Sequence, residues 1–114
     1  MPKNGLSIFK QNAIPAYLCI INASWKDANS GYSMGVFAAY VRSESLDPIE
    51  VIAQATVDIM RSSGLPVAPS HITVVQADKV IRSWMVGRDF VDDDLWDRVS
   101  TLIERVNPKR ARAV

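Results

Sequence analysis

Residues 47–66 read DPIEVIAQATVDIMRSSGLP, and this stretch decides the fold class. Asp47 is an N-cap acid, Pro48 occupies the first helical position and Glu50 the third. Gly64 followed by Pro66 is a typical C-terminal stop. The residues that would form one face of a helix recur at helical spacing: Ile49, Ile52, Thr56, Ile59 and Met60. The stretch therefore predicts a core helix over 48–63.

Two segments upstream of this helix are rich in β-branched and aromatic residues. Residues 16–25 read AYLCIINASW and residues 33–42 read SMGVFAAYVR, and the turn formers of 26–31 (KDANSG) separate them. The pattern predicts a β-hairpin. Both strands are apolar on both faces for much of their length, so we expect the sheet to need cover on both sides.

Downstream, residues 71–77 (HITVVQA) predict a third strand. The strand over 33–42, the helix and this third strand form a crossover, which should be right-handed and make the two strands parallel. The simplest sheet then places the first strand, 16–25, between the other two. For residues 78–87 we favour a short helix, because Val80, Ile81, Trp84 and Met85 fit helical spacing; the alternation of Val80, Trp84 and Val86 also allows a fourth strand.

A last helix is predicted to begin at Asp92 or Asp93 and to stop before Pro108. Its apolar stripe is Leu95, Val99, Leu102 and Val106. The expected fold is a small α+β domain over 1–108, with a basic tail at 109–114 that should be mobile. We expect a mixed or antiparallel three-stranded sheet that packs with two to three helices. The elements follow the chain order strand-strand-helix-strand, and the fold is expected to be partly ferredoxin-like.

Composition excludes several classes of function. The 114 residues carry a formal net charge of +1, so no bulk field points to nucleic acid or to a membrane surface. One cysteine and one histidine exclude an internal disulfide framework, a cysteine-rich zinc site and any chemistry that needs two histidines. Residues 1–12 lack the continuous apolar core of a signal peptide, so we expect a cytoplasmic protein.

Three features could carry chemistry, and each has a structural explanation. His71 is a lone histidine at the start of a strand, and Cys19 lies between apolar neighbours where a free cysteine acts as a small hydrophobe. The third feature is an acidic cluster: Asp89, Asp92, Asp93, Asp94 and Asp97. Its spacing does not match the twelve-residue calcium loop, whereas acids at a helix start cap free amides and complement the helix dipole. We expect no metal site, and an acidic surface for a basic partner stays open.

Phosphate loops, serine nucleophile elbows and paired-histidine motifs do not occur in the sequence. We therefore favour a small non-catalytic protein-binding protein of the inhibitor, immunity or anti-defence type, which occludes a partner protein and needs no cofactor. The acidic cluster, Phe37 and Tyr40 are its candidate contacts. The alternative is a homodimeric cofactor-free enzyme or ligand-sensing domain with a pocket near His71, Tyr17 and Tyr40.

The strand over 33–42 also predicts association. No charged residue lies between Ser33 and Val41 to discourage pairing with another strand. We expect the protein to associate through its sheet, either with a partner or with itself as a two-fold homodimer. A charge at Phe37 or Ala39 should disrupt a homodimer if those side chains lie on the outer face.

Overall fold

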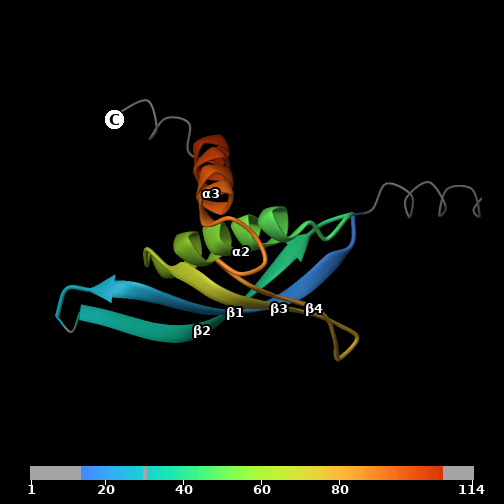
Figure 1. Ribbon diagram of the computed structural model, residues 1–114, viewed down its shortest axis with the longest axis horizontal. Helices are drawn as coiled ribbons and strands as arrows, with labels where there is room; N and C mark the ends of the chain where they lie inside the picture. Colours follow the sequence, from blue (N-terminus) through green and yellow to red (C-terminus); the bar gives the residue numbers. More distant parts are fainter. Residues whose placement is uncertain (1–13, 30, 107–114) are drawn as a thin grey trace, which may run out of the picture.

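The computed structural model describes residues 14–29 and 31–106. The elements in chain order are β1 (Ala16–Asp27), β2 (Gly31–Arg42), α2 (Pro48–Ser63), β3 (Ala68–Gln76), β4 (Lys79–Met85) and α3 (Asp92–Val106). All four strands form one antiparallel sheet in the order β2-β1-β3-β4 (Figure 1). The fold is a small α+β domain with two helices in the described part of the chain.

The helix predicted over 48–63 is confirmed at both ends. The Glu50 backbone N–H donates to Asp47 Oδ2 at 3.1 Å, which satisfies one of the free amides of the first turn. At the other end Gly64 adopts φ 73°, and its N–H donates to the Met60 carbonyl at 2.9 Å. The local signals of the sequence and the observed caps agree.

The position of the first strand is also confirmed. β1 pairs with β2 on one side and with β3 on the other, so it lies between them. Since both pairings are antiparallel, β2 and β3 run in the same direction, as the crossover through α2 requires. They are not neighbours, however, and the sheet has no parallel pair among its hydrogen-bonded strands.

The helix preferred for residues 78–87 is wrong, and the alternative of a fourth strand is correct. β4 pairs with β3 through a two-residue connection, Ala77 and Asp78, at φ 50° and 65°. Positive φ at both residues is typical of a type I′ turn, whose twist matches that of the paired strands. The sheet therefore has four strands rather than three, and two strands precede each helix, an element order that differs from the βαββαβ order of a ferredoxin-like fold.

Both helices lie on the same side of the sheet (Figure 1). α2 packs on β2 and β3, and α3 packs on α2. The largest fully buried side chains come from the sheet, from both helices and, for Val67, from the connection between α2 and β3: Ile21, Val41, Val51, Ile52, Ile59, Val67, Ile72, Val74, Leu95 and Val99. The apolar strands predict a need for cover on both sides of the sheet, and the described residues cover one side only, because the second helix packs on the first instead of crossing to the other side.

An ion pair joins the two helices. Arg98 on α3 donates from Nε to Glu50 Oε2 at 2.6 Å and from Nη2 to Glu50 Oε1 at 3.0 Å. This two-pronged hydrogen bond holds the pKa of the Glu50 carboxyl below its ordinary value. It joins α3 to α2 beside the buried Leu95 and Val99, which pack α3 into the core.

Within residues 14–29 and 31–106, no helix has the length and apolar character needed to cross a bilayer. The basic tail predicted at 109–114 lies outside the described residues, as does the end of the domain range beyond residue 106.

Candidate functional site

The sheet side that faces away from α2 and α3 is the principal surface feature of the molecule, and we call it the open face. Successive side chains of a strand point to opposite sides of the sheet. On β1 and β2 the odd-numbered residues, such as Cys19, Ile21 and Val41, are buried under the helices. The even-numbered residues of both strands therefore form the open face.

The open face is strongly apolar. Nine large apolar side chains are exposed in the described part of the chain, and six of them lie on this one surface: Tyr32, Met34, Val36, Tyr40, Val80 and Met85. Met34 is 84% exposed and Tyr40 is 74% exposed. Leu18 and Ile20 of β1 lie half-buried between the two outer strands. Four of the six lie on β2 and two on β4, the two edge strands of the sheet. Scattered exposed apolar residues are ordinary, whereas several on one face are typical of interaction surfaces.

Charge is confined to the ends of the hairpin part of this face. Lys26 and Arg42 both lie on the open face, one at each end of the β1–β2 pair. The residues between them on both strands are uncharged. The centre of the open face therefore combines apolar side chains with small polar groups.

Polar groups gather where β1, β3 and β4 meet. His71 Nε2 and Ser83 Oγ share a hydrogen bond of 2.7 Å across β3 and β4. At the bulge between β1 and β3, the Ser70 hydroxyl donates to the Asn22 carbonyl at 3.1 Å. Both hydrogen bonds join neighbouring strands of the sheet.

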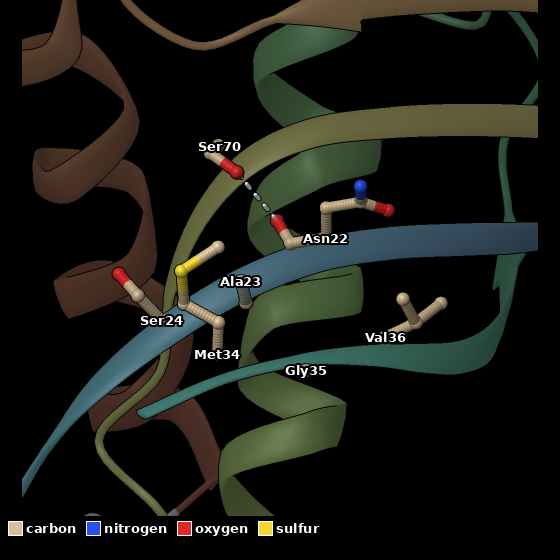
Figure 2. A pocket seen from close by; sticks show the side chains of 7 residues that line it. All are labelled: Asn22, Ala23, Ser24, Met34, Gly35, Val36 and Ser70. Carbon is tan, nitrogen blue, oxygen red and sulfur yellow. Dashed lines mark hydrogen bonds between the residues drawn. The ribbon is translucent and has the colours of Figure 1, made fainter. Parts of the chain in front are cut away.

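A shallow depression of about 420 Å³ indents the open face beside this bulge (Figure 2). Its lining consists of Asn22, Ala23, Ser24, Met34, Gly35, Val36 and Ser70. None of the seven has a titratable or strongly nucleophilic side chain. The depression can receive a side chain or a short polar segment, and it has no group suited to acid–base or nucleophilic catalysis.

The residues expected to line a catalytic or sensing pocket do not converge. Tyr40 and His71 lie on the open face, on strands separated by β1. Tyr17 lies on the opposite side of the sheet and packs against the core. Phe37 is also on the helix side, where its ring meets Trp25 edge-on at 5.6 Å between ring centroids.

Cys19 is fully buried in the core, and burial raises the pKa of its thiol to about 11. A thiol in this state is protonated at neutral pH and is a poor nucleophile. Cys19 therefore acts as a small core residue.

The acidic cluster begins in the loop before α3 and continues through its first turns. Asp89 accepts from the Met85 N–H at 2.7 Å and pairs with Arg88 at 3.1 Å, and the hydrogen bond from Arg88 holds the pKa of Asp89 below its ordinary value. Asp92, Asp93, Asp94 and Asp97 are exposed on α3. Among the described residues, no group of three or more acidic, histidine or cysteine side chains is arranged to hold a metal ion. Carboxylates in the first turn complement the positive end of the helix dipole.

The open face itself was only partly accessible to sequence reasoning. The sequence identifies Tyr40 as a candidate contact but does not identify the other exposed apolar residues of this face, which are Tyr32, Met34, Val36, Val80 and Met85. Their common signal is alternation: residues 32, 34, 36, 38 and 40 are apolar throughout, although one side of a solvent-facing strand is normally polar.

Comparison with known proteins finds no matching protein-family model, no similar curated protein and no similar solved structure. The functional conclusion therefore depends on the geometry of the molecule itself.

Proposed function

We propose that the protein is a small non-catalytic protein-binding protein that uses its open face to occlude a partner protein, in the manner of an inhibitor, immunity or anti-defence protein. The observation that carries the proposal is the gathering of six exposed large apolar side chains on one side of the sheet. We place the interaction in the cytoplasm, with a soluble protein as the partner.

The open face is large enough for a specific interface. Its strands hold 12, 12, 9 and 7 residues. At about 3.4 Å per residue and about 4.8 Å between strands, they span roughly 650 Å² of flat sheet. Side-chain relief enlarges the accessible area toward the roughly 800 Å² that each partner contributes to a stable interface.

The residue types also suit protein binding. Tyrosine and methionine are enriched at protein interfaces, where aromatic anchors carry much of the binding energy. Tyr32 and Tyr40 lie toward opposite ends of β2, with Met34 and Val36 between them. A protein surface can cover this span, whereas the shallow depression alone would leave most of a small molecule in water.

Paired substitutions on immobilised protein test the proposal. Val80 and Val91 are 63% and 62% exposed, but only Val80 lies on the open face. Wild-type protein and Val91→Lys should capture the same protein from a lysate of the source cells, and Val80→Lys should capture at least tenfold less. Circular dichroism should show all three variants folded.

Capture of the same proteins by all three forms would contradict the proposal, because binding would then be independent of the open face. A small molecule retained by native mass spectrometry, with no protein captured, would also contradict it and would favour the ligand-sensing alternative.

A further inference from the structure

We propose that β2 is a self-pairing edge, on which β2 of a second copy of this chain adds antiparallel about a two-fold axis at Val36. The product is a continuous eight-stranded sheet. This inference goes beyond the proposed function, because it assigns the edge of the sheet to a second copy and leaves the open face free for another partner.

The two outer strands of the sheet differ in how they are protected. Edge strands are normally short, bulged or charged, because an unprotected edge pairs with other chains. β4 has these devices: seven residues, a register shift opposite Val74 and Val75, and the charges of Lys79 and Arg82. β2 has none of them between Tyr32 and Val41, and its twelve residues pair with β1 without a shift.

The side-chain order of β2 is self-complementary about Val36. Antiparallel pairing centred there places Tyr32 opposite Tyr40 of the second copy and Met34 opposite Ala38 of the second copy. Val36 meets its own equivalent on the axis. Cross-strand aromatic pairs stabilise a sheet, and a long side chain opposite a short one avoids crowding.

The other side of β2 fits the same register. Gly35 comes to lie opposite Phe37 of the second copy, so an aromatic ring faces a residue without a side chain. The Trp25 ring already lies over Gly35, 3.2 Å from where a Cβ would be. Phe37 of the second copy therefore lies next to the Trp25 ring, and aromatic pairs at such contacts add to the stability of a sheet.

The two-fold axis is perpendicular to the sheet, so both open faces stay on the same side. The two open faces of the dimer together span roughly 1,300 Å² of flat sheet, twice that of one chain, with the apolar residues of both β2 strands at the centre.

Charge reversal at the axis tests the pairing. Wild-type protein at tens of micromolar should sediment with twice the mass of one chain. Val36→Lys and Val36→Glu should each sediment as monomers, because like charges meet across the axis. An equimolar mixture of the two variants should regain the doubled mass, and this recovery also shows that both variants are folded.

Val80→Lys is the matched control. Val36 and Val80 are 66% and 63% exposed on the same open face, but they lie on opposite edges of the sheet. Val80→Lys should remain dimeric while losing the partner capture described above, so the two proposals can fail separately.

Three results would overturn the inference. The first is a wild-type protein that stays monomeric at hundreds of micromolar. This result includes the case in which another segment of the same chain covers β2. The second is a dimer that Val80→Lys dissociates as fully as Val36→Lys, which would show face-to-face packing. The third is a mixture of Val36→Lys and Val36→Glu that stays monomeric.

Discussion

Single residues in this sheet take their role from which side of the strand they occupy. Ala39 is 4% exposed under the helices, whereas Tyr40, its neighbour, is among the most exposed aromatic side chains of the described residues. The charge proposed at Phe37 or Ala39 to disrupt a homodimer therefore falls on the helix side, where it would also disturb the core, so it does not test the pairing cleanly. Alternation was evident in the sequence, but its direction was not, because both sides of β1 and β2 are apolar.

The N-cap of α2 gives a residue-scale prediction. Asp47→Ala removes the acceptor of the Glu50 N–H and should lower the free energy of unfolding by about 1 kcal/mol. Urea denaturation measures this as a lower midpoint with an unchanged slope. Asp47→Asn keeps an acceptor at the same place and should stay within a few tenths of a kcal/mol of wild type. Equal midpoints for Asp47→Ala and wild type would show that the cap does not stabilise the fold.

At the scale of elements, prediction succeeded where local signals were complete and failed where one was missing. The helix over 48–63 had its cap, its apolar stripe and its terminating glycine in the sequence. The β3–β4 hairpin had no such signal, because Ala77 and Asp78 occupy turn positions that favour Asn and Gly. Trp84 and Ile81 pack toward the core in a strand that contains a bulge, and this spacing also fits a helix.

The same turn gives a prediction. Replacing Ala77 by Asn and Asp78 by Gly matches the residue preferences of a type I′ turn and relieves two residues held at positive φ. The double variant should be more stable than wild type by about 1 kcal/mol, measured by thermal unfolding. Gly64→Ala, at φ 73°, is the opposite case and should lower stability. A double variant that melts below wild type would contradict the assigned turn.

The contact between α2 and α3 predicts a pH dependence. Arg98 lowers the pKa of Glu50 below its ordinary 4.5 in the folded protein. The ion pair therefore contributes stability above that value, and the contribution is lost as the pH falls through the lowered pKa. At pH 7, Glu50→Gln should cost about 0.5–1 kcal/mol, since the pair is about one-third exposed.

The gap between Glu50→Gln and wild type should close in acid, as Glu50 becomes protonated. Glu44→Gln removes the same charge from an exposed position and should match wild type at every pH. A gap for Glu50→Gln that persists unchanged in acid would mean that lost packing, and not the ion pair, causes the destabilisation.

At the scale of the whole molecule, the arrangement of layers determines what the protein can do. Both helices cover one side of a four-stranded sheet, which leaves an apolar side and an unprotected edge strand exposed. Association through the sheet was predicted from β1 and β2 alone. The contribution of β4 to the open face was not predicted, because the sequence of residues 78–87 fits both a helix and a strand. Four residues of the acidic cluster belong to the helix layer, because Asp92, Asp93, Asp94 and Asp97 lie on α3, whereas Asp89 contacts the end of β4.

The central claim is that the protein meets other proteins through its uncovered sheet, with β2 as the pairing edge. Amide hydrogen exchange at low and high protein concentration tests it most directly, because a β2 amide that gains a partner strand becomes protected. Raising the concentration from about one to about one hundred micromolar should slow exchange in peptides from β2 and leave those from β4 unchanged. Doubled mass without protection of β2, or protection confined to the start of α3, would contradict the claim.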